Sequence, residues 1–474
     1  MNSTPKYILE QIKIAKEQQL KELNLSSLTT GYYLEKIPIE VFELEQLEKL
    51  NLKDNEIKKI PSEISKLKNL KSLDLIGNRQ LTEISQQLER LPNLIFLGLR
   101  WNINNLLLER FRHIPQLGLS LSEEQLTARQ DSLALLKNLT LLRMKWNLSK
   151  SFPSWIEKVE KLELDLSGNQ LTSLPSGISR LGNLTQLYLR NNKLTSLPKS
   201  LKKLTHLNLL HLGCNKLTIV PDFLGDLDNL TWLYLYSNQL TTIPNSLAKL
   251  AHLTKLDLNF NQLTNLPESL GNLVNLTGIY LRGNKLTNVP EFLNKLSHLI
   301  WLDLSDNQLT NIPESLSKLP RLIWLDLSDN QLTNIPESLT KLVHLNELNL
   351  NFNKLTNLPK YIGNLANLAL LDVSDNQLTN IPQSIGNLRA LAHLDLSYNQ
   401  LVNVPDSLSK LINLTQLDLS SNKFVTIPES IGNLRALTQL DLRNNQLTTV
   451  PEFLSNLRAL TQLDLRNNQL TTVP

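Results

Sequence analysis

An asparagine that recurs every 23 residues constrains this chain more than any other sequence feature. Fourteen such asparagines follow one another without a break, from Asn169 to Asn468. Around them the residues follow the pattern L-x-x-L-x-L-x-x-N-x-L-T-x-[LIV]-P, with two further Leu or Ile positions before the next copy. A repeat of about 20 to 50 residues predicts a solenoid, because a single copy cannot bury its apolar side chains without stacking on its neighbours.

The N-terminal third of the chain is less regular. Four more asparagines keep the pattern at uneven spacings, and they are Asn55, Asn78, Asn102 and Asn147. Two degenerate units have Leu28 and Glu124 at the Asn position. A carboxylate cannot donate a hydrogen bond and leucine can make none, so we expect local loosening at both units. With these units, the repeat period predicts about 20 coils.

The chemistry of the motif predicts an α/β solenoid. In L-x-L, alternate side chains point to opposite faces of a strand, so the leucines face inward and the intervening residues face outward. The Asn amide can satisfy backbone groups that a tight turn leaves unpaired inside the coil. The later Pro has no N–H and suits the chain where it leaves the turn for the convex side. We therefore expect a parallel β-sheet on the concave face and irregular or short helical segments on the convex face.

The two ends of the array differ. Residues 4–20 predict a capping helix with Thr4 at the N-cap, Pro5 in the first turn, and Ile8, Ile12 and Ala15 along one face. At the other end the chain stops at Pro474 within a repeat, so we expect the natural chain to continue past this residue. We divide the chain into a capping helix over 1–20, irregular repeats over 21–147 and regular repeats over 148–474.

Charge and targeting signals narrow the function classes. The chain has 48 Lys and Arg against 44 Asp and Glu, a near balance that argues against a dedicated nucleic-acid binder. The sequence has no run of about 18 apolar residues, the length that a membrane-spanning helix requires. The N-terminus lacks the apolar core of a secretory signal. The single cysteine, Cys214, allows no intramolecular disulfide. We expect a cytoplasmic protein, and the sequence does not determine its oligomeric state.

Motifs of enzymes and cofactor sites are absent from the sequence. There is no phosphate-binding G-x-x-x-x-G-K-[ST], no G-x-G-x-x-G, no H-E-x-x-H and no C-x-x-C. His211 and Cys214 come nearest to a nucleophile pair, but no third group is placed to orient the histidine. We therefore expect no catalytic residue, no cofactor and no metal site in these residues, although an enzymatic module could lie beyond Pro474.

The repeat resembles the leucine-rich-repeat family, in its 23-residue class with a Leu-Pro-x-x-Leu segment, and this resemblance implies a horseshoe-shaped solenoid. The charged capping helix and the segment E-L-N-L-S-S-L, from Glu22 to Leu28, are similar to the N-terminal arrays of bacterial Roco proteins. In that family the array precedes a GTPase and is thought to sense partners. Similar repeats occur in Scribble-type scaffolds and in plant Ras-group-related proteins.

Four outward positions in each repeat form rows along the predicted sheet. They lie six, four, two and one residues before the Asn, and we call them the first, second, third and fourth outward rows. Five of the six tryptophans fall in these rows, two of which are Trp101 and Trp146. We predict that the partner-binding residues are Tyr188, Arg190, Trp232, Tyr234, Tyr236, Phe260, Tyr280, Arg282, Trp301, Trp324 and Phe352.

Two interpretations of these aromatic residues remain open. Trp, Tyr and Arg are enriched at binding hot spots, which favours a non-catalytic scaffold that binds a protein or peptide on its concave face. Aromatic neighbours on adjacent strands could instead stack for stability. The alternatives in function are a sensor array of a Roco-type signalling enzyme and an exported, internalin-like host-binding protein.

A file of aspartates occupies the second outward row of many repeats, and neighbouring like charges should raise the pKa of some of them. The file either docks a basic partner or is simply the residue that this class of repeat uses at that position.

Overall fold

The computed structural model describes residues 5–27, 32–100, 114–122, 139–145, 154–174 and 176–471. These residues form two compact units. Unit 1 comprises residues 1–190 and 203–209, and unit 2 comprises residues 191–202 and 210–474. The division falls inside the regular array that we predicted to begin at residue 148. The predicted loosening at Leu28 and Glu124 concerns positions outside the described residues.

Unit 1 is a ladder of parallel strands that follow one another in chain order. Its strands are β1 (Glu22–Asn24), β2 (Lys49–Asn51), β4 (Ser72–Asp74), β6 (Phe96–Arg100), β7 (Gln116–Ser122), β8 (Leu139–Lys145), β9 (Lys161–Asp165) and β10 (Leu184–Tyr188). A second small sheet pairs β3 (Lys59–Ile60) with β5 (Glu83–Ile84). Short 3-10 helices lie between the strands, namely η1 (Ile39–Glu43), η2 (Ser62–Lys66), η3 (Gln86–Arg90), η4 (Ser154–Lys158) and η5 (Ser176–Arg180).

An α-helix, α1 (Lys6–Glu17), precedes the first strand. Its apolar residues Ile8, Ile12 and Ala15 are buried, as the sequence predicted. The N-cap is Pro5 and not Thr4, which lies outside the described residues. Proline accepts no hydrogen bond through its side chain, so this helix begins without the capping bond that we predicted. The Lys16 ammonium donates to Glu43 at 2.7 Å and links the helix to η1.

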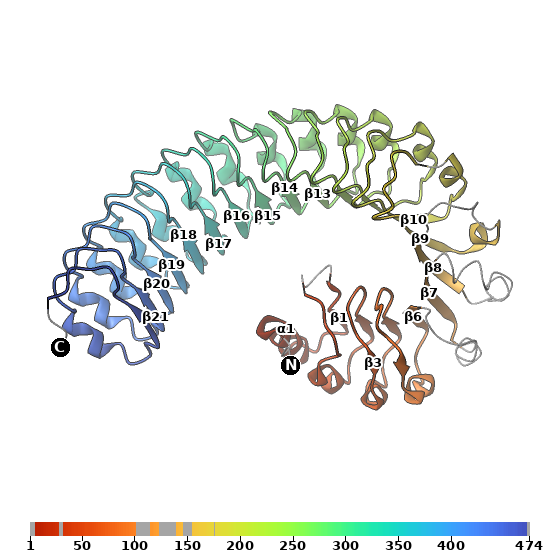
Figure 1. The fold of residues 1–474 in the computed structure, drawn as a ribbon, viewed down its shortest axis with the longest axis horizontal. Coiled ribbons are helices and arrows are strands. Elements are labelled where there is room, and N and C mark those ends of the chain that lie inside the picture. Colours follow the sequence, from red (N-terminus) through yellow and green to blue (C-terminus); the bar gives the residue numbers. More distant parts are fainter. Residues whose placement is uncertain are drawn as a thin grey trace. The chain divides into compact units, whose positions relative to one another are not determined.

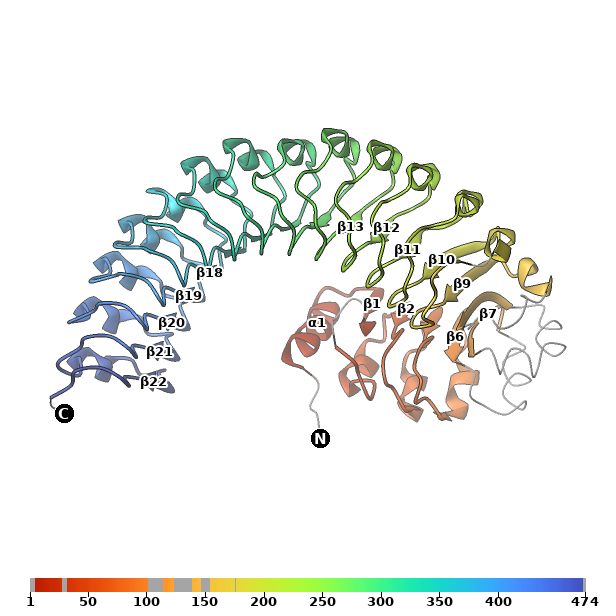
Figure 2. The same ribbon diagram turned by 45° about the horizontal axis from the view of Figure 1, so that its top comes forward.

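Unit 2 repeats one coil with little variation (Figures 1 and 2). Its strands are β11 (Leu209–His211), β12 (Trp232–Tyr234), β13 (Lys255–Asp257), β14 (Gly278–Tyr280), β15 (Trp301–Asp303), β16 (Trp324–Asp326), β17 (Glu347–Asn349), β18 (Leu370–Asp372), β19 (His393–Asp395), β20 (Gln416–Asp418), β21 (Gln439–Asp441) and β22 (Gln462–Asp464). Neighbouring strands from β12 to β22 pair in parallel, and each residue pairs with the residue at the same place in the next repeat.

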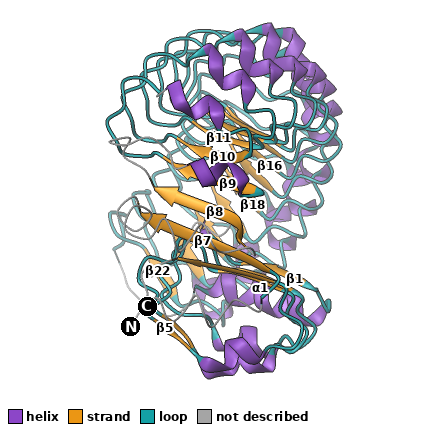
Figure 3. Cartoon of the chain, turned by 90° about the vertical axis from the view of Figure 1, so that its right-hand side faces the viewer, coloured by secondary structure: helices purple, strands orange, loops and turns teal. Residues whose placement is uncertain are grey.

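Helical turns cover the outer side of unit 2, on the opposite side from the sheet (Figures 2 and 3). They are the 3-10 helices η6 (Lys199–Lys203), η7 (Asp222–Asp226), η8 (Asn245–Lys249), η9 (Glu268–Asn272), η10 (Glu291–Lys295), η11 (Glu314–Lys318), η12 (Glu337–Lys341), η13 (Ile362–Asn364), η14 (Gln383–Asn387), η15 (Asp406–Lys410), η16 (Glu429–Asn433) and η17 (Glu452–Asn456). η6 begins in unit 2 and ends in unit 1, and β11 begins in unit 1 with Leu209. The prediction of a parallel sheet with short helical segments opposite it is confirmed.

The repeated asparagines bind neighbouring coils together. Asn307 is typical: its Nδ2 donates to the carbonyl oxygens of Leu304 at 3.1 Å and Leu281 at 2.9 Å. Its Oδ1 accepts from the backbone N–H of Leu286, in the preceding coil, at 3.0 Å. Each bond satisfies a backbone group that the turn would otherwise leave unpaired in an interior of buried leucines. This is the role that the donors and acceptor of the Asn side chain predicted.

The residue before each asparagine adopts a left-handed backbone conformation. In unit 2 the φ angle at this fourth-row position lies between 49° and 65° from Asn191 to Asn467. Most repeats place Asn, Asp, Ser or Gly there, and of these Gly, Asn and Asp tolerate this conformation best. Phe260, Phe352 and Tyr398 are exceptions, because a bulky side chain at positive φ is strained.

Candidate binding surface

Large aromatic side chains gather on the outward rows of β12 to β17 in unit 2. We call Trp232, Tyr234, Tyr236, Phe260, Tyr280, Trp301, Trp324 and Phe352 the aromatic surface. Strand register places Trp301 directly beside Trp324 on the neighbouring strand. Trp232 is aligned with Lys255, and Lys255 with Gly278. The 23-residue spacing therefore brings these side chains onto one face of one sheet.

Several of these rings are open to solvent. Trp232 is 41% exposed, Trp301 44% and Phe352 53%. Among the described residues, Trp232, Trp301, Trp324 and Phe352 make no ring contact with another aromatic side chain. Although Trp301 and Trp324 lie side by side, they do not stack. Stabilisation by aromatic stacking therefore does not account for these four residues.

A polar and aromatic cluster lies next to the tryptophans on β11 to β14. The Lys255 ammonium sits 5.7 Å from the ring centre of Tyr234 and 5.1 Å from that of Tyr280, within the range of cation–π contacts. Burial lowers the pKa of Lys255. Burial also raises the pKa of Tyr280 to about 12 and that of Asp257 to about 6. Lys255 was not among the residues predicted from the sequence. Its outward position in the coil between those of Tyr234 and Tyr280 could have identified it.

Glycines give two rings of this surface room to lie flat. A side chain at Gly213 would collide with the ring of Tyr236, and one at Gly283 would collide with the ring of Phe260. The Arg282 guanidinium lies over the Phe260 ring, 5.6 Å from its centre. Phe260, at its strained backbone position, therefore holds a cation on its exposed face.

His211 belongs to the aromatic cluster. Its ring stacks on Tyr234 with 4.9 Å between the ring centres, and its Nδ1 accepts from the Gly213 N–H at 3.3 Å. Nothing in this arrangement supports a nucleophile pair with Cys214. No group of three or more His, Cys, Asp or Glu side chains in the described part of the chain could hold a metal ion.

The remaining predicted residues lie elsewhere. Tyr188 and Arg190 belong to unit 1, so the structure does not place them with the aromatic surface. Arg190 is exposed, but Tyr188 is only 8% exposed and its hydroxyl donates to Gln186 at 2.7 Å. Tyr188 therefore offers little area to a partner, because its ring is covered. Trp101 and Trp146 lie outside the described residues.

The aspartates of the second row have a shared local role. Each uses Oδ1 to accept the backbone N–H two residues later, as Asp326 does from Ser328 at 2.9 Å. Asn349 makes the same bond to Asn351 at 3.1 Å. Because Asn and Asp are interchangeable in this turn, local structure is one sufficient reason for the aspartate file. The second carboxylate oxygen and the charge are not needed for it.

The pKa values of some aspartates of this file in unit 2, namely Asp257, Asp303, Asp395 and Asp441, are raised as predicted, but chiefly for a different reason. Burial is the largest cause for Asp303 and for Asp395, whose pKa rises to about 6. Repulsion from neighbouring aspartates comes after burial and the hydrogen bonds of the serines. Charge spacing in the sequence predicts this repulsion, but it does not predict the desolvation of a concave sheet face.

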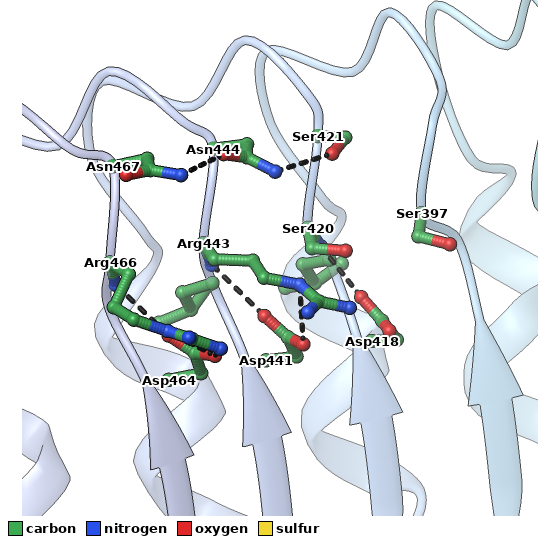
Figure 4. Close-up of polar contacts among 12 residues, drawn as sticks. Ser397, Asp418, Ser420, Ser421, Asp441, Arg443, Asn444, Asp464, Arg466 and Asn467 are labelled. Carbon is green, nitrogen blue, oxygen red and sulfur yellow. Dashed lines mark hydrogen bonds and ion pairs between the residues drawn. The ribbon is translucent and has the colours of Figure 1, made fainter.

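At the C-terminal end of unit 2, aspartates of the file form ion pairs with arginines (Figure 4). Arg443 pairs with Asp441 at 3.1 Å, and Arg466 pairs with Asp464. The hydrogen bond from Arg466 lowers the pKa of Asp464 to about 2. Beside these pairs, the Asn467 amide donates to Asn444 at 2.7 Å. The last two coils therefore neutralise their own outward carboxylates.

Parts of the outward rows of unit 1 are buried, although Lys49 and Arg190 in the same rows are exposed. Ile76 in the third row is fully buried, and burial raises the pKa of Asp74 in the second row to about 6. The Lys53 ammonium contacts both oxygens of Glu163, at 2.9 and 3.1 Å, although the two residues are 110 positions apart. Side chains from distant coils of unit 1 therefore meet on its outward rows at this ion pair.

Comparison with protein families agrees with the repeat seen in the structure. A family model described as leucine-rich repeat region matches residues 162–276 and 325–423. Two further leucine-rich-repeat models match residues 274–332 and 412–470, and residues 45–89. No curated protein sequence matches the chain significantly.

Solved structures of this fold are similar along the chain. A leucine-rich-repeat protein of Leptospira interrogans is 29% identical, with a TM-score of 0.64, over 99% of this chain and 95% of that one. An internalin from Listeria monocytogenes is 28% identical, with a TM-score of 0.59, over 66% and 88%. The ectodomain of an Arabidopsis thaliana receptor kinase, solved with Casparian strip integrity factor 2, is 28% identical, with a TM-score of 0.51, over 95% and 62%. Repeat, fold and family models thus agree that this chain is a leucine-rich-repeat protein.

Proposed function

We propose that this chain is a non-catalytic binding protein whose partner, a protein or a peptide, packs on the aromatic surface of unit 2. One observation carries the proposal: several large aromatic side chains are exposed and unstacked on a regular parallel sheet. Side chains held by a rigid sheet lose little conformational entropy on binding, so each buried ring contributes more of its area to affinity. The receptor-kinase ectodomain that is similar in fold was solved in complex with Casparian strip integrity factor 2, which supports a binding role for an array of this kind.

The test compares binding with folding. We expect that replacing Trp232, Trp301 and Trp324 together by alanine abolishes binding of a purified partner, measured by calorimetry after its identification by affinity capture. Each ring at an interface core contributes about 2 kcal/mol or more, so the triple change should weaken binding by more than a thousandfold. The thermal midpoint should change by only a few degrees, because these rings are partly exposed and make no contact with another ring.

A control removes exposed apolar groups away from the outward rows. Ile219, Val402 and Ile412 are all about 60% exposed and none lies in an outward row. Their triple replacement by alanine should leave binding unchanged. A large loss of thermal stability with retained binding in the tryptophan variant would show that the rings serve the fold.

The likeness to an internalin favours a second candidate, an exported protein that binds a host receptor. None of the helices in the described residues combines the length and apolar character that a membrane crossing requires. Fractionation of the source cells separates this candidate from a cytoplasmic scaffold. A Roco-type sensor array predicts instead that the native polypeptide binds guanine nucleotides, which a filter-binding assay on the natural full-length protein measures.

A further inference from the structure

Charge is unevenly distributed over unit 2. The outward rows of β15 to β20 contain 24 positions, of which nine carry a carboxylate and none carries Lys or Arg. The whole chain has a net charge of +4, so composition does not explain this excess. Among the described residues, none of these nine carboxylates forms an ion pair with Lys or Arg, whereas Asp441 and Asp464 in the next two coils do.

Three of these carboxylates lie in the fourth row, beside exposed rings. In five consecutive coils it reads Asp306, Asp329, Phe352, Asp375 and Tyr398, and we call these residues the acidic–aromatic edge. Their φ angles lie between 49° and 52°, so the five side chains leave the backbone in closely similar directions. Adjacent coils are about 4.8 Å apart. The edge therefore presents carboxylates and aromatic rings at a fixed spacing over about 20 Å.

The carboxylates of this edge do not serve the local turn. Asp303 and Asp326 in the second row accept backbone N–H groups, but the side chains of Asp306, Asp329 and Asp375 accept no hydrogen bond from the described residues. Burial and neighbouring aspartates raise the pKa of both Asp329 and Asp375. A cation placed between them would relieve this repulsion, because it gives each carboxylate an opposite charge.

The same row contains an internal example of a cation on such a ring. Phe260 occupies the fourth row of its coil, and the guanidinium of Arg282 lies 5.6 Å from its ring centre. Phe352 occupies the equivalent place with the same backbone conformation, but no cation of the described chain covers it. The two coils next to that of Phe352 each carry a carboxylate in the same row, Asp329 before it and Asp375 after it. Their positions would favour a cation on this ring more than on Phe260.

We infer that an extended segment of the partner, rich in Arg or Lys, lies along the acidic–aromatic edge and places a basic side chain on Phe352 between Asp329 and Asp375. This inference rests on the proposed function and names the chemistry of the partner. About six extended residues span the five coils, and alternate residues of such a segment face the edge. Three basic side chains would therefore reach the carboxylates and rings.

The probe is a synthetic peptide of sequence Gly-Arg-Ser-Arg-Ser-Arg-Gly with a fluorescent label, measured by anisotropy on the complete chain. We expect it to bind at least about tenfold more tightly than the same peptide with neutral citrulline at each Arg, because charge-assisted contacts are lost. A peptide with Glu in place of Arg should not bind. Raising the salt concentration from about 0.05 M to about 0.3 M should weaken binding, since these contacts are at the surface.

Variants locate the contact. Asp329→Asn with Asp375→Asn should reduce affinity for the Arg peptide about tenfold, and Phe352→Asn should reduce it several-fold. Asn suits the left-handed backbone at these positions, so folding is retained. The control, Glu429→Gln with Glu452→Gln, removes the same charge from the opposite side of unit 2 and should leave affinity within twofold after salt correction.

Two results would overturn the inference. One is equal binding of the Arg and citrulline peptides, and the other is equal loss of affinity in the edge and control variants. Failure of the proposed function is measured separately, with the natural partner and the tryptophan variant. A partner that needs the tryptophans but binds the Asp329→Asn, Asp375→Asn variant normally would leave the proposed function standing and refute the basic segment.

Discussion

In unit 1, the third-row Lys53 contacts the first-row Glu163 from a coil 110 residues further along the chain. In unit 2, Glu347 occupies the same first row as Glu163, but it is only half-buried and has no ion pair among the described residues. Both units bury their leucines and bond their asparagines in the same way. The inward residues therefore specify the coil, and the outward residues are free to serve either packing or recognition.

The largest expected effect breaks the packing of unit 1. Glu163→Ala should lower the free energy of unfolding of that unit by about 3 kcal/mol, because it removes the carboxylate that the largely buried Lys53 ammonium contacts. The matched change Glu347→Ala, in the same row of unit 2, should alter stability by less than about 0.5 kcal/mol. Hydrogen exchange in increasing urea, followed at β9 and at β17, measures the two effects in one protein sample. Similar losses at both strands would show that the outward rows do not differ between the units.

The ion pair of unit 1 also marks the limit of prediction from sequence. The 23-residue period places Trp301 beside Trp324, because a parallel register is set by the spacing alone. The donors and acceptor of Asn307 predicted that its side chain bonds backbone groups of its own and the preceding coil, because every coil repeats the same turn. Contact between Lys53 and Glu163 depends on how sharply many successive coils rotate, and no single repeat encodes that rotation.

Part of the local conformation can be predicted from composition alone. The fourth row is rich in Asn, Asp, Ser and Gly, a composition typical of left-handed backbone. That signal is sufficient to identify Phe352 and Tyr398 as residues in a strained conformation, a prediction that we did not make. The cause of the raised pKa values is harder to predict from the sequence, because burial of Asp257 and Asp395 depends on the neighbours that curvature brings close.

A second prediction concerns how the stability of unit 2 depends on pH. It tests whether the outward rows of this unit retain groups that lower its stability. The folded-state pKa of Asp257 and of Asp395 is about 6, against 3.8 without the fold. A raised carboxyl pKa means that the folded state holds the proton more tightly, so stability is greatest below pH 3.8 and falls as the pH rises to about 6. Each group should therefore lower stability at neutral pH by about 1 kcal/mol, after allowance for solvent screening.

Asn at these two positions should remove this loss. Asp257→Asn with Asp395→Asn keeps the turn bond, as Asn349 does in the wild-type chain. The double variant should unfold at a higher temperature than wild type at pH 8 and at the same temperature near pH 4. Calorimetry across this range is the measurement. A gain that is equal at both pH values would mean that charge burial is not its cause.

The smallest expected effect distinguishes recognition from packing at the strained rings. Phe352 and Tyr398 are each 53% exposed and have φ angles of 49° and 51°. Asn at either position should raise the free energy of unfolding by up to about 1 kcal/mol, because it accepts a left-handed backbone more readily than an aromatic residue does. The same change at Phe352 should weaken binding of the Arg peptide, so stability and affinity should move in opposite directions.

The sign of this change in the free energy of unfolding shows whether an outward residue serves packing or recognition. If a ring serves packing, its replacement should lower the free energy of unfolding, as replacement of Glu163 should in unit 1. A ring retained for recognition lowers stability in the free protein and is kept because a bound partner compensates for the strain. Urea titrations of Phe352→Asn and Tyr398→Asn resolve the direction if several replicates are compared with wild type. Loss of stability in both variants would assign these rings to the fold and place unit 2 with unit 1.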